Sequence, residues 1–282
     1  MNTPDVPPKL VAALKAGKCS LFVGAGLSVR AGVPNWKRLL EILLKEGEDK
    51  KLIAPGSRAE LEAALADSGK FLAVAEQLAD DFGIVGLQAE IGKAIRIANP
   101  SPEPIHHNLI DIPFQHVVTT NYDHLIEDAY AKVKGKTLPT FTHEDSADLA
   151  EALWDNRYFI LKAHGDLQRR DTLILTRRDY RRLIYRSPGY KTLLGTIFTN
   201  CKLLFLGTSM QDPEIILLLE FLHDSFHSGG KNHFALMEES TVQPFEQRRW
   251  LKDYCVQIIT YKKSDDSHPE VSEFVSNIKA AM

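Results

Sequence analysis

A short apolar run that ends in closely spaced glycines limits the folds open to this chain more than any other stretch. Cys19 to Val23 has the length and the β-branched and aromatic content of a buried parallel strand. Gly24-Ala25-Gly26 follows, and a helical pattern comes next. In α/β proteins such a turn presents backbone N–H groups to a phosphate, so we expect an anion site at this turn. A turn that binds no ligand stays open, because Val29 stands where the dinucleotide fingerprint has its third glycine.

The composition is that of an ordinary globular protein. Of the 282 residues, 44% are hydrophobic and 25% are charged, which indicates neither disorder nor a fibre. The net charge of -3 gives no general attraction to nucleic acid or to an anionic membrane. No apolar run approaches the ~18 residues of a membrane span, and no signal-peptide pattern opens the chain, so we expect a cytoplasmic protein. The three cysteines are scattered and form no Cys-x-x-Cys pair, so we expect neither a disulfide framework nor a metal site.

Strands and helices alternate along most of the chain. This rhythm predicts an α/β fold with a Rossmann-like, doubly wound, mostly parallel sheet of about six strands. The candidate strands are Cys19 to Val23, Gln115 to Thr119, Arg157 to Lys162, Lys202 to Leu206, His233 to Met237 and Val256 to Tyr261. Residues 47–104 carry helical patterns and no strand, so we expect an inserted helical module there, with part of residues 167–200 packed on it. Residues 1–46 and 105–282 form the predicted Rossmann-like domain.

Four of these candidate strands end in small or polar residues. They read GAGLS after the first strand, TTNYD after the second, AHGD after the third and GTSMQD after the fourth. In a doubly wound sheet such ends meet at one crevice, so Asn121, Asp123 and His164 are expected to face one nucleotide. A histidine titrates near neutral pH and can move a proton, whereas an amide can orient a hydroxyl group or a water.

The set GAGLS, TTNYD, AHG and GTS, in this order, resembles the sirtuin superfamily of NAD-consuming enzymes. The resemblance implies that Asn121 contacts the nicotinamide ribose, that Asp123 holds the nicotinamide amide and that His164 is the base. It also implies that the glycine turn takes the pyrophosphate and that the loop after the fourth strand takes the adenosine side. The cofactor-binding residues expected on this basis are Gly24, Ala25, Gly26, Ser28, Trp36, Thr120, Asp123, Gly207, Thr208 and Ser209.

Departures from that superfamily narrow the expected activity. Sirtuin deacylases carry a zinc ribbon of four cysteines after the H-G pair, and this chain has no cysteine between Cys19 and Cys201, so we expect no zinc. The chain is more similar to zinc-free, sirtuin-like bacterial proteins, in which V-P-x-W, T-T-N-Y-D and G-x-S-x-x-D are common. Members of that group degrade NAD+ as effectors of anti-phage defence. The resemblance therefore implies an NAD+ glycohydrolase that releases nicotinamide and ADP-ribose, with Asn121 and His164 as its catalytic residues.

The resemblance also has consequences for partners. An enzyme that depletes NAD+ has to be silent until it is triggered, so we expect a homo-oligomer or control by a separately encoded activator. A DNA-translocating ATPase accompanies some relatives and is one candidate for that activator. We expect no membrane association and no direct binding of nucleic acid.

Several alternatives stay open on the sequence alone. The same cofactor would serve a protein deacylase or an ADP-ribosyltransferase, and a non-catalytic subunit could bind NAD+ or ADP-ribose as a sensor. Asn121 could cap the helix that follows it, and His164 could be a hydrogen-bonded structural histidine. Asp212 is expected to be the N-cap of a helix whose first residue is Pro213, and it is left out of catalysis.

Overall fold

Seven parallel strands form one sheet in the computed structural model, which describes residues 3–54, 56–226 and 233–282. Across the sheet the order is β3 (Thr140–Thr142), β4 (Ile160–Lys162), β2 (Val117–Thr119), β1 (Cys19–Val23), β5 (Lys202–Leu206), β6 (His233–Glu238) and β7 (Val256–Tyr261). All neighbouring pairs are parallel, which confirms the predicted fold class. The strand that the sequence did not indicate is β3, a partly buried edge strand whose sequence, Thr-Phe-Thr, contains no apolar run.

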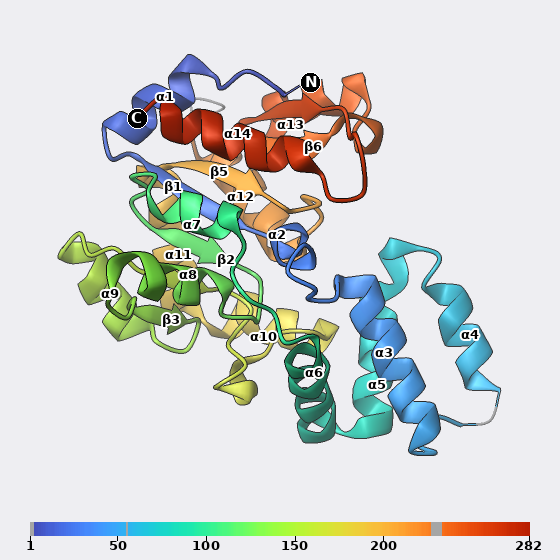
Figure 1. Cartoon of the computed structure of the whole chain (residues 1–282). Helices are drawn as coiled ribbons and strands as arrows, with labels where there is room; N and C mark the ends of the chain where they lie inside the picture. The colour runs from blue at the N-terminus through green and yellow to red at the C-terminus, as the bar shows by residue number, and fades with distance from the viewer. Residues whose placement is uncertain (1–2, 55, 227–232) are drawn as a thin grey trace.

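Helices cover both faces of the sheet because successive side chains of each buried strand point to opposite sides. Leu21 and Val23 belong to one core cluster, whereas Phe22 belongs to the other. The first cluster is covered by α1 (Pro8–Lys15), α7 (Pro104–Ile110), α8 (Leu125–Lys134) and α14 (Pro269–Ala280) (Figure 1). The second is covered by α9 (Ser146–Trp154), α10 (Arg177–Arg186), α11 (Pro188–Asn200), α12 (Pro213–Ser225) and α13 (Pro244–Tyr254).

A separate group of helices stands beside the sheet, at the lower right of Figure 1. It consists of α3 (Trp36–Asp49), α4 (Ser57–Ala64), α5 (Phe71–Phe82) and α6 (Ile84–Ala98), with the short 3-10 helix η1 (Ser68–Lys70). These helices share a third cluster, which Leu173 and Leu175 also join. Helix α3 continues to Asp49, past the predicted boundary at residue 46. The division of the chain into two domains stays a prediction.

The remaining short elements are connections. Helix α2 (Ala25–Val29) follows β1 directly, and the 3-10 helices η2 (Arg170–Thr172) and η3 (Glu239–Thr241) lie in loops. None of the helices in the described part of the chain is both long and apolar enough to cross a lipid bilayer.

The register of the central strands brings four strand ends to the same level. Val23, the last residue of β1, pairs with Thr119 on one side and with Leu206 on the other. Thr119 pairs in turn with Lys162, the last residue of β4. The chain leaves β1 toward β2 on one side and later returns to β5 on the other. That change of direction defines the crevice at which doubly wound sheets bind ligands.

The loop after β5 is pressed against the beginning of α2. Gly26 donates its N–H to the carbonyl oxygen of Gly207, 2.7 Å away. Gly207 has a φ of +67°, and a Cβ atom there would lie 2.5 Å from the backbone nitrogen of Leu27. Only glycine fits this position without moving one of the two loops.

We predict that Gly207→Ala destabilises the fold more than an alanine at a glycine with the same backbone angle. Gly135 is the control, since its φ is +68° and nothing lies within 4 Å of the place that a Cβ atom would take. Gly135→Ala is expected to cost about 1 kcal/mol through backbone strain alone. Gly207→Ala is expected to cost about 2 kcal/mol more, because overpacking adds to the strain. Urea unfolding measures both values, and equal losses would contradict the tight contact between the two loops.

Candidate active site

The glycine turn after β1 is bound to the loop after β5. Gly24 donates its N–H to the carbonyl oxygen of Leu206 (2.9 Å), in addition to the bond between Gly26 and Gly207. Ala25 and Gly26 are exposed, whereas Ser28 is buried. Two segments predicted to contact opposite halves of a dinucleotide are therefore in direct contact, with Ala25 and Gly26 open to solvent.

Asn121 lies in the loop after β2 and reaches across to the glycine turn. Its Nδ2 donates to Ser28 Oγ (2.8 Å) and to the carbonyl oxygen of Gly24 (3.1 Å). Its backbone N–H donates to Thr119 Oγ1 (3.0 Å), and its Oδ1 is buried with no hydrogen-bond partner. A buried acceptor without a partner costs free energy, so this oxygen remains able to accept a hydrogen bond.

The alternative interpretation of Asn121 as a helix cap is wrong. Helix α8 begins at Leu125, and Asp123 Oδ1 accepts the hydrogen bond from the backbone N–H of that residue (3.1 Å). Asp123 is only 6% exposed. Asp123 thus binds the start of the helix, and the Asn121 amide is left to hold the glycine turn.

His164, in the loop after β4, is buried beside a carboxylate. Its Nε2 lies 3.2 Å from Asp212 Oδ2 and makes no hydrogen bond, and its ring meets the ring of Tyr180 edge-on at 5.2 Å. Burial lowers the pKa of His164 below its ordinary value, and the Asp212 charge offsets part of that shift. The imidazole is therefore neutral at neutral pH, which is the form that can accept a proton.

Asp212 has two roles, one of which the sequence indicated. Its Oδ1 accepts from the backbone N–H groups of Glu214 (3.0 Å) and Ile215 (3.2 Å), which confirms it as the N-cap of α12. Its Oδ2 accepts from the Tyr180 hydroxyl (2.8 Å) and faces His164. A side chain left out of catalysis is therefore a neighbour of the predicted base.

Glu214 is a second carboxyl group near His164 that the sequence analysis did not single out. Its Oε2 lies 3.9 Å from His164 Nε2 and 3.3 Å from the Tyr190 hydroxyl, which donates to it. Burial and the nearby Asp212 charge raise the pKa of Glu214 to about 8. At neutral pH this carboxyl group is mostly protonated.

The other predicted ligands are distributed around these loops. Trp36 begins α3, packs edge-on against Phe71 (5.5 Å between ring centres) and has a buried Nε1 without a hydrogen-bond partner. Thr120 is half-buried, and Ser209 is exposed. Thr208 Oγ1 accepts from the backbone N–H of Met210 (3.1 Å) and so shapes its own loop. Hydrogen bonds join Asn121 to Ser28 and Gly24, and Gly26 to Gly207. Trp36, in contrast, packs against the core of the helical group.

Two groups of side chains in the described residues could offer three metal ligands each. One is His124, Glu127 and Asp166, and the other is His164, Asp212 and Glu214. Lys162 Nζ already lies within the first group, 3.1 Å from Glu127 and 3.2 Å from Asp166. In the second group tyrosine hydroxyls donate to both carboxyl groups. Neither group contains a cysteine, and the expectation of no metal stays a prediction.

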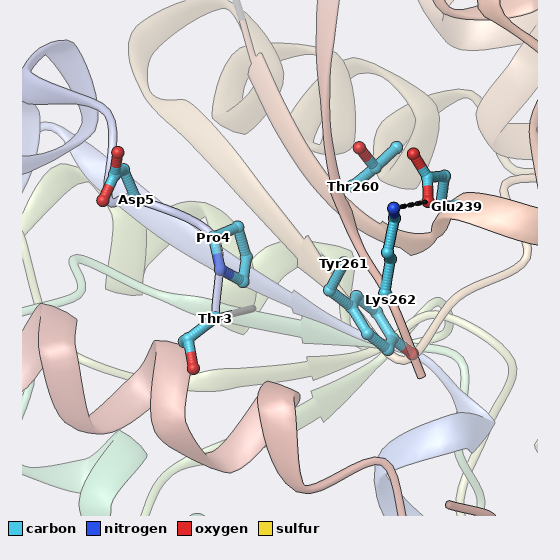
Figure 2. Close-up of a pocket in the computed structure, with 7 residues that line it drawn as sticks. All are labelled: Thr3, Pro4, Asp5, Glu239, Thr260, Tyr261 and Lys262. Atoms are coloured by element: carbon cyan, nitrogen blue, oxygen red, sulfur yellow. Dashed lines mark ion pairs between the residues drawn. The ribbon is translucent and has the colours of Figure 1, made fainter. Parts of the chain in front are cut away.

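A shallow pocket of about 290 Å³ lies elsewhere, between the N-terminal segment and the end of β7. Figure 2 shows Thr3, Pro4 and Asp5 on one side of the pocket and Tyr261 and Lys262 on the other, with Lys262 paired to Glu239 at 3.7 Å. None of the predicted site residues lines this pocket, so it is not part of the candidate active site.

The sequence that forms these strand-end loops also matches a known family. Residues 115–259 match the model of the SIR2-like domain. The chain belongs to the SIR2-like domain family. The match includes the loops that carry Asn121, His164 and Gly207, and it confirms the sirtuin-like character inferred from the four motifs.

Curated relatives of this SIR2-like chain are longer proteins. It is 28% identical over 251 residues to Defense-associated sirtuin 2 of Bacillus subtilis. The aligned region covers 86% of this chain and 23% of the relative. It is 25% identical over 236 residues to the NAD(+) hydrolase ThsA of Acinetobacter baumannii (82% and 44%). It is 27% identical over 246 residues to the NAD(+) hydrolase ThsA of Enterococcus faecium (83% and 46%). The chain thus spans less than half the length of these relatives.

We predict that the His124–Asp166 pair makes stability depend on pH. His124 Nε2 lies 2.9 Å from Asp166 Oδ1, and this contact raises the pKa of His124 in the folded protein. The charged imidazole therefore stabilises the fold at pH values below the ordinary histidine pKa of ~6.5, and this contribution is lost as the pH rises through the raised value. The free energy of unfolding of the wild type should exceed that of His124→Gln most at about pH 5.5 and least in alkaline solution.

A matched control is His223→Gln, because His223 faces the exposed Asp224 (3.4 Å). Urea unfolding at a series of pH values should show a much weaker pH dependence for that substitution. A difference between wild type and His124→Gln that does not change with pH would contradict the prediction.

Proposed function

We propose that this chain hydrolyses NAD+ to nicotinamide and ADP-ribose and acts as an NAD+-depleting effector in bacterial defence against phage. The single observation that carries the proposal is the position of Asn121 and His164. Each lies two residues beyond Thr119 or Lys162, which are paired on neighbouring strands, so both loops leave the carboxyl edge of the sheet at the same level. The names of the relatives, NAD(+) hydrolase and defense-associated sirtuin, support the substrate and the biological role.

Cleavage of NAD+ at C1′ of the nicotinamide ribose needs positioning and charge stabilisation. Nicotinamide is a cationic leaving group, so the transition state has oxocarbenium character and a water can complete the reaction. Asn121 Oδ1, buried and without a partner, accepts a hydrogen bond from the ribose hydroxyl or from the attacking water. His164, neutral because it is buried, takes the proton as general base.

Asp212 is proposed to assist this proton transfer through its contact with the imidazole ring of His164. When His164 accepts a proton, the carboxylate 3.2 Å from Nε2 stabilises the imidazolium that forms. The negative charge also lies near the centre where positive charge develops on the sugar. Asp212 is thus proposed as a positioning and electrostatic partner of His164.

The dinucleotide is proposed to lie across the joined loops. The exposed backbone at Ala25 and Gly26, with Gly24 and Ser28, binds the pyrophosphate, and Gly207, Thr208 and Ser209 bind the adenosine side. Thr120 and Asp123 contact the nicotinamide end. Trp36 closes this end of the site from the helical group, since Trp36 and Tyr122 pack against the same hydrophobic cluster.

Self-association and control by a separate protein are part of the proposal. Helices α12 and α13 pack together and expose large apolar side chains, among them Phe221 (58% exposed) and Phe245 (57% exposed). Exposed apolar side chains on neighbouring helices are typical of protein interfaces. This surface suits a second copy or a separately encoded activator, for which a DNA-translocating ATPase is one candidate.

We predict that Asn121→Ala and His164→Ala each lower NAD+ hydrolysis about 100-fold or more, because each removes a group that acts on the reacting atoms. Asn200→Ala is the control, since this exposed side chain ends α11, away from the carboxyl ends of the strands, and the variant is expected to keep full activity. Chromatography of nicotinamide and ADP-ribose measures the rates. Full turnover by folded His164→Ala would remove its role as base.

The same assay separates the rival functions. Nicotinamide release that requires an acylated peptide or an acceptor protein would indicate a deacylase or an ADP-ribosyltransferase. Binding of NAD+ without release of nicotinamide, in the presence of candidate activators and at high protein concentration, would indicate a sensor. Both results would contradict the proposed hydrolase.

We predict that Asp212→Asn keeps the fold, lowers kcat and moves the acid limb of the pH–rate profile. Asparagine caps helices as well as aspartate does, so α12 should stay intact. The carboxylate raises the pKa of His164, so its loss lets the pKa of His164 fall further. The acid limb of kcat/KM should therefore move to lower pH. An unchanged limb in a variant with native stability would show that Asp212 does not act on His164.

A further inference from the structure

Lys162 is a charged residue at a position where the strand pattern requires an apolar one. It ends β4, which lies between β3 and β2 in the sheet, and its side chain is 0% exposed. Burying an ammonium group costs free energy unless other groups replace its water shell. The groups around Lys162 therefore indicate the role of the buried ammonium group.

Within the described residues, the polar contacts of the Lys162 ammonium go to the segments that follow β2 and β4. Nζ donates to the carbonyl oxygens of Asp123 (2.6 Å) and Tyr122 (3.1 Å), which directly follow Asn121 in the chain. It also lies 3.1 Å from Glu127 Oε1 on α8 and 3.2 Å from Asp166 Oδ2. The ammonium thus ties the backbone of the Asn121 loop to a carboxylate of the His164 loop.

Asp166, the carboxylate that Lys162 contacts in the His164 loop, is itself held by hydrogen bonds. Its Oδ1 accepts from the backbone N–H of Gln168 (2.7 Å), and its own N–H donates to Thr172 Oγ1 (3.0 Å). Gly165 makes the turn possible, because its φ is +90° and a Cβ atom there would lie 2.2 Å from the Thr172 carbonyl oxygen. His164 is therefore held between Lys162 and Asp166, two residues before it and two residues after it.

We propose that Lys162 and Asp166 form a clamp that fixes the Asn121 loop relative to His164, and that Lys162 is a positioning residue for the reaction. Its effect on turnover rests on the proposed function, whereas its effect on the loops does not. An apolar side chain of similar volume in this position is often as stabilising as a buried ion pair, so stability alone does not require the lysine. What the ammonium adds is a fixed link to two backbone carbonyls, which no apolar side chain makes.

The reaction explains why such a link matters. Asn121 and His164 act on one sugar from loops that leave different strands, and the strands themselves end at Thr119 and Lys162. A displacement of about 1 Å between groups that share a reacting atom can cost on the order of 100-fold in rate. A clamp one residue beyond Asn121 restrains that displacement.

The first test is hydrogen exchange, which needs no turnover. In Lys162→Met the backbone amides of residues 120–126 are expected to exchange at least tenfold faster than in the wild type, while amides in β6 and β7 keep their protection. The control is Phe234→Leu, a buried substitution in β6 on the other half of the sheet. If the two variants lose protection in the same segments, or if the 120–126 segment stays protected in Lys162→Met, the clamp is wrong whatever the chain hydrolyses.

The second test is a double-mutant cycle on NAD+ hydrolysis. Lys162→Met alone is expected to lower kcat on the order of 100-fold with a smaller change in KM for NAD+, since the ammonium binds the Asn121 and His164 loops. If Lys162 acts through Asn121, the double variant Lys162→Met/Asn121→Ala should be no slower than Asn121→Ala. Independent, multiplicative losses in the cycle would overturn the positioning role.

If Lys162→Met fails to fold, Asp166→Asn is the variant that tests the clamp. Asparagine preserves the shape of the side chain and removes the charge that faces Lys162, so it should reproduce the same pattern to a smaller extent. Faster exchange at residues 120–126 and a lower kcat in folded Asp166→Asn would support the clamp. Wild-type exchange with a wild-type kcat would overturn it. Absence of NAD+ hydrolysis in the wild type would remove the proposed function but leave the exchange result to decide the clamp.

Discussion

The parallel register around β1 is the constraint on which the rest of the structure depends. Val23 pairs with Thr119 and with Leu206, and Thr119 pairs with Lys162, so four loops leave the sheet at one level. Their contacts follow from this register, including the Asn121 amide on Ser28 and the Gly26 N–H on Gly207. Because parallel strands direct all their carboxyl ends to one edge, residues nearly 190 positions apart in the chain are brought to the same edge of the sheet.

Two buried clusters of polar side chains lie next to these loops, one around Lys162 and one around His164, and they have different roles. Around Lys162 the ammonium is surrounded by acceptors from two loops and serves to hold backbone in place. Around His164 the carboxylate of Asp212 lies 3.2 Å from a neutral imidazole, and it helps to raise the pKa of Glu214. A site with a fixed negative charge beside a neutral base suits a reaction in which positive charge develops on the substrate. The cluster around Lys162 thus positions the loops, and the cluster around His164 sets the charge at the proposed site.

Much of this organisation could be predicted from the sequence, and the failures have physical causes. The glycine turn, the strand ends and the Asp212 cap were predictable because each depends on local rules for turns, parallel strands and helix starts. The edge strand β3 was missed because its sequence, Thr-Phe-Thr, is only partly buried and contains no apolar run. Lys162 and the second contact of Asp212 were missed because both depend on partners from distant segments, here Tyr122, Asp123 and His164. The sequence signal for Lys162 was a charge at the end of an otherwise apolar strand, just before the H-G pair.

The most direct test of the account is a crystal structure of the His164→Ala variant bound to NAD+. The account predicts that the pyrophosphate lies on the glycine turn, that the nicotinamide ribose contacts Asn121, and that its C1′ faces the space left by the imidazole. A dinucleotide bound elsewhere on the chain, or one whose ribose does not approach Asn121, would contradict the claim that the four strand ends form a single NAD+ site.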